Sequence, residues 1–363
     1  MQKSPGKEYT RHKEYSLVLA LLAGAGLIFL ETAVNMGLLL VLNGLAVVSI
    51  LFSASSVVRH ADVLAHRFGE PYGSLILSLS IVILEVCMIS ILMLSGAAGE
   101  TLMRDTIYSV IMIVMTGFIG LALLLGGHKY ETQNFNLSGI RHYLISITPL
   151  AIIVLALPSV MPGKTFSPSQ LGVVSLACLG LYVFFLRTQT VTHRYFFIHE
   201  DEDSDGEGHG KPSSHTSAWH FAMLAVHLVA VIGVTKLGSV PLKELLAALD
   251  APPAFAGFLV ALLILSPEGT GAFKSILQDQ VQRAMNLFLG SVLATICLTV
   301  PVVVLIALLT GQTVELGLSM PEIVLMATTF LVCQTSLTGG ETNAHSGAAH
   351  VALFCVYVML LFV

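Results

Sequence analysis

Two glutamates occupy positions where a protein rarely places a charge. Glu85 lies in SLSIVILEV (78–86), and Glu268 lies in LLILSPEG (262–269). Each interrupts an apolar run, and a charged side chain at the centre of a membrane helix costs about 2.5–3.5 kcal/mol on insertion scales. Carboxylate oxygens bind hard metal cations and also protons, so the two kinds of ion compete for the same atoms. The glutamates therefore predict a site that binds a metal cation and protons.

Hydroxyl side chains lie close to both glutamates in the sequence. Ser78 precedes Glu85 by seven residues, about two helical turns, and so shares its helix face. Ser266 is separated from Glu268 by Pro267 alone. Proline removes a backbone donor, so we expect the helix to break or kink there and to free carbonyl oxygens for a cation. Both serines are candidate secondary ligands; the alternative is that each bonds only to the backbone of its own helix.

Another apolar run, NLFLGSVLATICLTVPVVV (286–304), adds two hydroxyls. Ser291 and Thr295 are four residues apart, so a helix presents them on one face. They are candidate ligands, or they are small residues that let helices approach closely. Two histidines, His220 and His227, also share a helix face. They could relay protons, and the simpler interpretation is that they are packed neutral imidazoles.

The composition indicates that the elements around these residues lie in a membrane. The chain of 363 residues is 55% hydrophobic and 11% charged, with a mean hydropathy of +0.86. A soluble domain carries about 25% charged residues. The polar start MQKSPGKEYTRHKEY leads into two successive apolar runs and lacks the pattern of a cleavable signal. The five cysteines lie in apolar runs, where we expect small buried side chains and no disulfide framework.

Eleven apolar runs are long enough to predict membrane-spanning helices. Because lipid admits only helices and closed barrels, the fold class is an all-α integral membrane protein. The expected spans are residues 16–31, 33–53, 73–95, 107–126, 143–161, 168–187, 218–240, 255–273, 285–309, 321–338 and 347–363. Thirteen of the 17 Lys and Arg fall in the N-terminal segment and in every second loop. This bias predicts a cytoplasmic N-terminus and a periplasmic C-terminus.

A polar stretch, HEDEDSDGEGHGKPSSHTS (199–217), divides the chain into two halves. Its charges, Gly, Ser and Pro predict a flexible cytoplasmic loop. It is either a regulatory segment that senses cations or pH, or a solvated linker. The predicted organisation is an N-terminus with an extra helix (1–32), a first five-helix repeat (33–187), the linker (188–217) and a second five-helix repeat (218–363). The acidic residues of the loop are Glu200, Asp201, Glu202, Asp203, Asp205 and Glu207.

A unit of five helices crosses the membrane an odd number of times and therefore ends on the side opposite to its start. A second copy that follows it must enter the membrane from that opposite side. This is the inverted-repeat arrangement of secondary transporters, which place their sites near the midplane. YGSLILSLSIVILEV (72–86) and AGFLVALLILSPEG (256–269) match across the halves when one gap of a single residue is allowed. Each segment has a glycine at its second position and a glutamate at its last position but one. We therefore expect Glu85 and Glu268 to face each other in the protein interior.

The chain resembles the calcium/cation antiporter superfamily, and most of all its bacterial ChaA-type branch of calcium or sodium–potassium/proton antiporters. The resemblance rests on residues 57–86 and 257–269, and it extends through MRDTIYSVIMIV (103–114), QVQRAMNLFLGSVLATICLTVP (280–301) and GAAHVALF (347–354). It implies ten core helices in two inverted repeats, one extra N-terminal helix, and cation and proton binding in alternation at Glu85 and Glu268.

One departure from the related calcium/proton exchangers bears on selectivity. Their repeats carry GNA[ATV]E, whereas the glutamates here follow Val-Ile-Leu (82–84) and Leu-Ser-Pro (265–267). Without the Asn, fewer side-chain oxygens surround the cation. The departure predicts a site that admits Na⁺ or K⁺ as well as Ca²⁺.

The sequence thus predicts a secondary active antiporter of the bacterial inner membrane that exports Ca²⁺, Na⁺ or K⁺ in exchange for H⁺ by alternating access. A cation channel and a sodium-coupled exchanger are the alternatives. An enzyme is not expected, because we find no nucleophile–base or HExxH-type motif. We expect metal cations, protons and lipid as partners, with no cofactor and no nucleic acid; the sequence does not indicate an oligomeric state.

Overall fold

The computed structural model of the chain describes residues 14–29, 36–69, 72–96, 99–197 and 215–362. Nearly all of them are helical, as predicted. Several helices join end to end through short π-helical or 3₁₀ segments, labelled η. In chain order the elements are α1 (Tyr15–Phe29), α2 (Met36–Phe68), α3 (Tyr72–Leu94), α4 (Leu102–Met112), η1 (Ile113–Phe118), α5 (Ile119–Tyr130), β1 (Thr132–Asn134), α6 (Leu137–Ala151), η2 (Ile152–Ala156), η3 (Leu157–Val160), η4 (Pro162–Lys164), α7 (Pro168–Arg187), η5 (Thr188–Thr192), η6 (Arg194–Phe196), α8 (Ser217–Ala248), α9 (Pro253–Ile276), α10 (Val281–Ala294), η8 (Thr295–Thr299), α11 (Val300–Thr310), α12 (Met320–Ser336), β2 (Glu341–Asn343) and α13 (Ala344–Leu360).

Among the described residues, eight helical stretches are long and apolar enough to cross a membrane, and α1 and α13 are shorter apolar helices. Every predicted apolar run coincides with a helical stretch, but several helices extend beyond their run. α2 continues from the apolar run through SASSVVRHADVLAHRF to Phe68, because its polar residues there pack against α8 or face outward. The predicted boundary at residues 31–32 and most of the acidic segment 199–217 lie outside the described residues.

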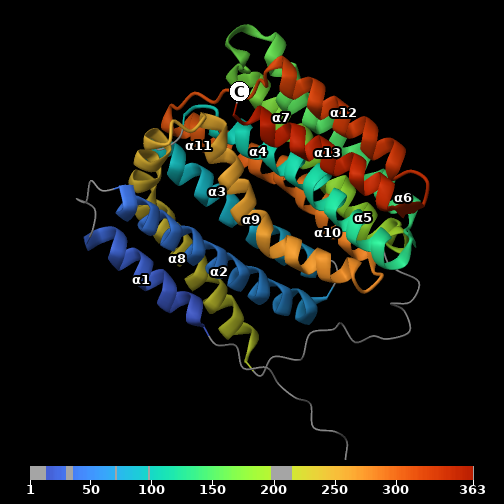
Figure 1. The fold of residues 1–363 in the computed structure, drawn as a ribbon, viewed down its shortest axis with the longest axis horizontal. Helices are drawn as coiled ribbons and strands as arrows, with labels where there is room; N and C mark the ends of the chain where they lie inside the picture. Colours follow the sequence, from blue (N-terminus) through green and yellow to red (C-terminus); the bar gives the residue numbers. More distant parts are fainter. Residues whose placement is uncertain (1–13, 30–35, 70–71, 97–98, 198–214, 363) are drawn as a thin grey trace, which may run out of the picture.

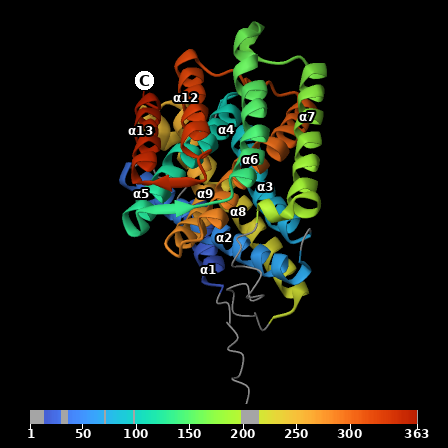
Figure 2. The same cartoon turned by 90° about the vertical axis from the view of Figure 1, so that its right-hand side faces the viewer.

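Two short strands correct the all-α expectation. Thr132–Asn134 of β1 pairs antiparallel with Glu341–Asn343 of β2 and so joins the two halves (Figure 2). The side chain of Gln133 is buried and donates to Asp279 Oδ1 at 2.7 Å. Strands of three residues are too short to give a periodic hydrophobic signal, which explains why the sequence pattern did not indicate them.

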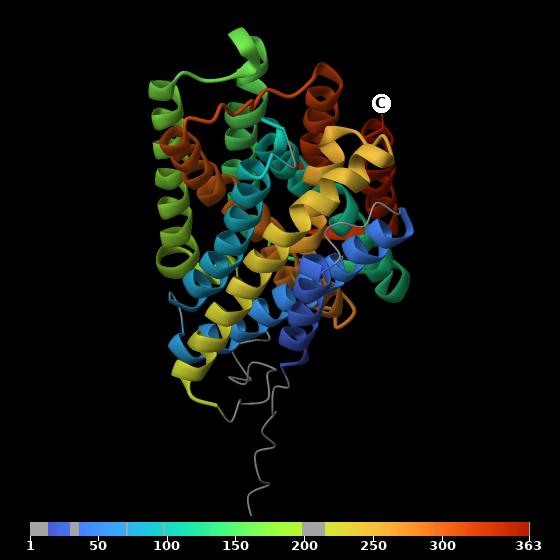
Figure 3. The ribbon, with the colours of Figure 1, turned by 90° about the vertical axis from the view of Figure 1, so that its left-hand side faces the viewer.

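The helices form two packed groups. α1, α2 and α8 lie side by side along one flank (Figures 1 and 3), and α12, α13, α6 and α7 stand on the opposite flank (Figure 2). α3 and α9 contact α2 and lie between these groups, with α4, α5 and α10 beside them. The two glutamate-bearing helices therefore run through the middle of the molecule.

Small residues allow the central helices to approach closely. A Cβ atom at Gly257 of α9 would lie 2.7 Å from the backbone of Asp105 and Thr106 in α4. In the same way, a Cβ at Gly347 of α13 would lie 2.6 Å from the backbone of Leu124 in α5. Close contact through glycine is the usual way in which membrane helices gain packing energy.

The third long helical stretch of each half contains a π-helical turn near its middle. η1 separates α4 from α5 in the first half, and η8 separates α10 from α11 in the second half. π-helical turns occur mostly as single turns inside α-helices and are frequent at functional sites. Both turns are largely buried, so they mark the interior where the candidate site lies.

Candidate functional site

Glu85 lies in the middle of α3 and is fully buried. Its Oε2 atom accepts a hydrogen bond of 2.9 Å from the hydroxyl of Thr295, at the start of η8. Its Oε1 atom is buried and has no hydrogen-bond partner among the described residues. A buried carboxylate with an unused oxygen gains from any proton or cation that reaches it.

Glu268 lies in the second half of α9 and is only half buried. The hydroxyl of Ser291 in α10 interacts with its carboxyl group. Within the described part of the chain, the Oε2 atom of Glu268 is buried and without a hydrogen-bond partner. Thr295, which bonds to Glu85, lines the same cavity as Glu268. The structure thus brings together the two residues that the sequence pattern paired.

Two cavities lead to Glu268. The first has a volume of about 200 Å³, and its walls include Ser78, Ser291 and Thr295 as well as Glu268. The second has a volume of about 360 Å³ and is lined by Glu268 together with other polar and charged residues: Ser55, Arg59, Asp62, Thr270, Ser275 and Arg283. An ion can therefore approach Glu268 from the side on which α2 ends and α10 begins.

The four predicted secondary residues fall into two groups. Ser78, Ser291 and Thr295 all line the first cavity, and Thr295 contacts Glu85 directly. The hydroxyl of Ser266 instead donates to the backbone carbonyl of Leu262, one turn earlier in its own helix. Ser266 thus bonds to the backbone of its own helix, which was the alternative to a ligand role.

Of the predicted break or kink at Pro267, the break is wrong. α9 runs without interruption from Pro253 to Ile276, with Pro267 inside it. Membrane helices tolerate proline where neighbouring helices and hydroxyl groups satisfy the freed backbone atoms. The hydroxyl of Thr270 donates to the Pro267 carbonyl at 2.7 Å, and a Cβ atom at Gly269 would lie 2.7 Å from the ring of Phe118.

One neighbour of the site was missed by the sequence reasoning. Thr299 is fully buried at the end of η8, four residues after Thr295. The i, i+4 spacing in NLFLGSVLATICLT was a usable signal, because it continues the series of hydroxyls from Ser291 and Thr295.

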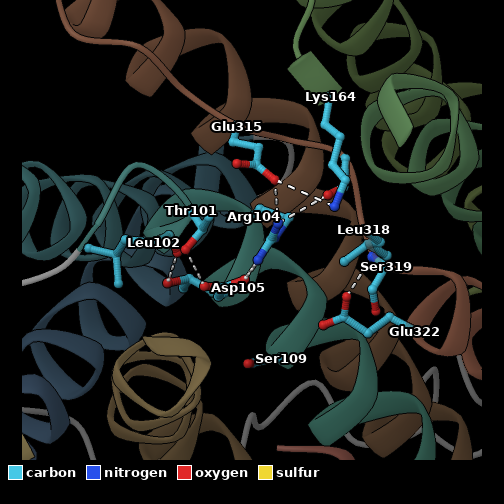
Figure 4. A network of polar contacts seen from close by, with 12 residues as sticks. Thr101, Leu102, Arg104, Asp105, Ser109, Lys164, Glu315, Leu318, Ser319 and Glu322 are labelled. Atoms are coloured by element: carbon cyan, nitrogen blue, oxygen red, sulfur yellow. Dashed lines mark hydrogen bonds and ion pairs between the residues drawn. The ribbon is translucent and has the colours of Figure 1, made fainter. Parts of the chain in front are cut away.

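A second polar cluster joins α4 to residues near the end of η4 and in the segment before α12 (Figure 4). Arg104 in α4 pairs with Asp105 at 2.8 Å and with Glu315 at 3.1 Å, and Lys164 lies 3.9 Å from Glu315. Thr101 donates to the other oxygen of the buried Asp105 at 2.8 Å. The sequence reasoning overlooked Asp105 because the predicted span began at residue 107, whereas α4 begins at Leu102.

α4 makes further hydrogen bonds beyond this cluster. Tyr108 donates to the backbone carbonyl of Glu322 at 3.2 Å, and Tyr357 donates to the hydroxyl of Ser109 at 2.7 Å. The carboxylate of Glu322 caps α12 through the backbone nitrogen of Ser319. These contacts join α4 to α12, α13 and the segment 311–319.

The histidines have different surroundings. His350 is buried between the backbone carbonyl of Met115 at 2.6 Å and the hydroxyl of Ser336 at 2.7 Å, as expected for a packed imidazole. His220 and His227 lie near the start of α8, where they meet residues of α2 and the segment before α1. The predicted regulatory residues Glu200, Asp201, Glu202, Asp203, Asp205 and Glu207 lie outside the described residues.

Comparison with known proteins supports this reading of the fold. The family model described as sodium/calcium exchanger protein matches residues 38–191 and 219–363. The sodium-potassium/proton antiporter ChaA of Escherichia coli K12 is 55% identical over 356 residues, which cover 97% of each chain. The Ca²⁺/H⁺ antiporter ChaA of Bacillus subtilis 168 is 23% identical over 272 residues, covering 72% of this chain and 77% of that protein.

Solved structures share the architecture. Native YfkE superimposes with a TM-score of 0.71 at 18% identity and covers 96% of this chain and 99% of its own. The H⁺/Ca²⁺ exchanger CAX superimposes with a TM-score of 0.67 at 16% identity, covering 95% and 89%. At such low identity these likenesses establish the fold and no more.

Proposed function

The chain belongs to the sodium/calcium exchanger protein family, and from this premise we propose that it exchanges a metal cation for protons at Glu85 and Glu268. The observation that carries the proposal is the pair of carboxyl groups on α3 and α9, of which Glu85 is fully buried and Glu268 half buried, joined by Thr295, which bonds to Glu85 and lines the same cavity as Glu268. Two ionised carboxylates in a poorly hydrated interior repel each other unless a cation or a proton compensates their charge. Metal cation and proton therefore exclude one another at the pair.

The cation is proposed to be Na⁺ or K⁺ as well as Ca²⁺. The relative with 55% identity is named a sodium-potassium/proton antiporter, and more distant relatives are named Ca²⁺/H⁺ antiporters. The two carboxylates match the charge of Ca²⁺, but Ca²⁺ takes 6–8 oxygen ligands. Here the hydroxyls of Ser78, Ser291 and Thr295 are the nearby side-chain oxygens that line the first cavity, so water must complete the shell.

We propose that this conformation is open toward the cytoplasm. The second cavity reaches Glu268 from the side of Arg59 and Arg283, and the excess of Lys and Arg on that side favours a cytoplasmic orientation. On the other side, the Arg104–Glu315 ion pair and the Tyr357–Ser109 hydrogen bond close the protein. In the alternate conformation these contacts would separate and the cytoplasmic cavity would close.

The proposed transport unit consists of two inverted five-helix repeats, residues 33–187 and 218–363, with α1 as an extra helix and eleven spans in all. Two features support the repeat. Glu85 and Glu268 lie in α3 and α9, the second spans of their halves, and the π-helical turns η1 and η8 interrupt the third. The proposed location is the bacterial inner membrane, with the N-terminus in the cytoplasm and the C-terminus in the periplasm.

Everted membrane vesicles test the proposal. A pH gradient with an acidic vesicle interior should drive cation uptake into wild-type vesicles, with Ca²⁺, Na⁺ and K⁺ tested separately. Glu85→Gln and Glu268→Gln preserve side-chain size but remove the exchangeable charge, so each should abolish exchange. Wild-type exchange in either variant would refute the proposal.

The same vesicles separate the alternative functions. A channel would conduct the cation without moving protons in return, and its flux would persist when the pH gradient is collapsed. A sodium-coupled exchanger would require a Na⁺ gradient and would ignore pH. Proton counterflow that follows the cation flux is the result expected of the antiporter.

A further inference from the structure

Three side chains from distant parts of the chain converge where α1, α2 and α8 meet. They are Glu14, which immediately precedes α1, His60 of α2 and His227 of α8, and their ligand atoms all lie within 4.8 Å of one another. His227 Nε2 is 2.9 Å from Glu14 Oε2, and His60 Nε2 is 3.5 Å from Glu14 Oε1. The two imidazole rings are stacked, with centroids 5.7 Å apart, so both present Nε2 to the same carboxylate.

The surroundings of His60 and His227 orient their imidazole rings in a way that suits metal binding. His60 and His227 are fully buried. The Nδ1 atom of His60 lies 2.8 Å from Nδ1 of His220. When His60 Nδ1 donates in this bond, its Nε2 keeps the lone pair that faces Glu14. Such a hydrogen bond behind a histidine ligand is the usual means by which proteins orient imidazoles toward a metal.

The carboxylate is also suited to coordination. Burial raises the pKa of Glu14, but the hydrogen bond from His227 and the charge of Arg59 outweigh it, so the pKa lies below the usual value. The carboxylate is therefore ionised at neutral pH. Arg59 occupies Oε2 at 2.8 Å, whereas Oε1 is buried and has no hydrogen-bond partner among the described residues. This oxygen is the one that faces His60.

The donor atoms select the class of metal. Two imidazole nitrogens and one carboxylate oxygen are typical ligands of Zn²⁺ and similar transition metals, whereas Ca²⁺ and Mg²⁺ prefer oxygen alone. Bonds of about 2.0–2.2 Å in a tetrahedral zinc site place neighbouring ligand atoms about 3.4 Å apart. The separation of 3.5 Å between His60 Nε2 and Glu14 Oε1 matches this value. His227 Nε2 lies 2.9 Å from the other carboxylate oxygen, Oε2, so the carboxylate must turn slightly for Oε1 and both nitrogens to reach one ion.

We propose that Glu14, His60 and His227 form a binding site for a divalent transition metal such as Zn²⁺, separate from the transport site. Three protein ligands leave the fourth position of a tetrahedral ion for water. Because Arg59 places a positive charge beside the carboxylate, the affinity is lower than that of a structural zinc site. A bound ion ties α1 to α2 and α8. Since α2 and α8 contact α3, it also restrains the helix that carries Glu85.

Calorimetry on the full-length protein in detergent tests the binding. The chelator-stripped protein is titrated with ZnCl₂ in excess Ca²⁺, which occupies the glutamate pair. We expect one zinc ion per chain, with the affinity reduced at least about 10–100-fold in His60→Gln and His227→Gln. His142→Gln is the matched control, because His142 bonds to its own helix at Ser138. It should bind zinc as the wild type does.

Three results would overturn the proposal: unchanged affinity in both His60→Gln and His227→Gln, loss of binding in the double variant Glu85→Gln/Glu268→Gln, or loss of binding when His199 and His209 of the polar segment are replaced by alanine. Co²⁺ provides a second measurement through the visible absorption of a tetrahedral ion. Glu14→Gln should weaken this band, and because Glu14 precedes α1, this variant tests the site without altering a helix interior.

The effect on transport rests on the proposed function and is measured separately. If the ion restrains α2 and α8, Zn²⁺ should slow exchange by the wild type and by His142→Gln but not by His227→Gln. Zinc binding without any change in exchange would leave the metal site intact and would overturn only the restraint. Failure of the proposed antiport activity would not alter the calorimetric result.

Discussion

Replacing Thr295 with valine should move the pH dependence of exchange. Thr295 is buried and donates a hydrogen bond of 2.9 Å to Glu85 Oε2. A hydrogen bond to a charged group is worth about 1.5–3 kcal/mol. It stabilises the ionised carboxylate, so its loss favours the protonated form, which is the form that cannot hold the cation. Valine has nearly the same shape as threonine and should leave the packing of η8 intact.

The magnitude follows from the same bond. At 1.36 kcal/mol per pH unit, its loss corresponds to about one to two pH units. The midpoint of exchange should therefore move upward by about that amount. At a fixed pH below the new midpoint, the apparent affinity for the cation should fall by about 10–100-fold.

The assay is exchange in proteoliposomes over a series of pH values, with wild type, Thr295→Val and Thr295→Ser compared side by side. Thr295→Ser keeps the hydroxyl and should retain the wild-type midpoint. An unchanged midpoint in Thr295→Val would show that the bond does not bias the protonation of Glu85. An equal shift in both variants would show that packing, rather than the hydroxyl, is responsible.

Three further predictions concern the helices around the site, and thermal unfolding in detergent measures each. Arg104→Gln leaves the buried Asp105 without its ion pair and should destabilise the protein by about 3–5 kcal/mol; the double variant with Asp105→Asn should recover part of this loss, and no recovery would refute the pairing argument. Gly257→Ala places a Cβ atom 2.7 Å from the backbone of α4 and should cost about 1–3 kcal/mol. Gly271→Ala, in the same helix, meets nothing within 4 Å and should be neutral or stabilising, so equal effects of the two glycine variants would contradict the close-contact explanation. Tyr357→Phe removes the bond to Ser109 and should cost about 1 kcal/mol, whereas a stability equal to wild type would show that this hydroxyl pair contributes nothing.

The positions of the helices could be predicted from hydropathy because each span must be apolar along most of its length. The lengths could not be predicted in the same way. α2 extends to Phe68 and α8 to Ala248. In the extension of α2, polar side chains contact neighbouring elements: Nδ1 of His60 lies 2.8 Å from Nδ1 of His220 in α8. Such contacts appear only once two helices are placed beside each other.

The candidate site likewise has residues that could be predicted from the sequence and contacts that could not. The isolation of Glu85 and Glu268 in apolar runs pointed to both residues, and the spacing of Ser291 and Thr295 placed both hydroxyls on the correct face. The convergence of Glu14 with His227 could not be predicted, because the residues are 213 positions apart and neither lies in a recognisable motif. The continuity of α9 through Pro267 likewise depends on packing against other helices.

The π-helical turn η8 limits where residues can be inserted into or deleted from the chain. A π-helical turn holds one residue more than an α-helical turn, and one residue corresponds to about 100° of rotation around the helix axis. Deleting one residue within Thr295–Thr299 would restore a regular α-helix and would rotate all of Val300–Thr310 against its neighbours. Insertions and deletions should therefore be absent from η8, because each would turn the residues of α11 away from the neighbours that they now contact.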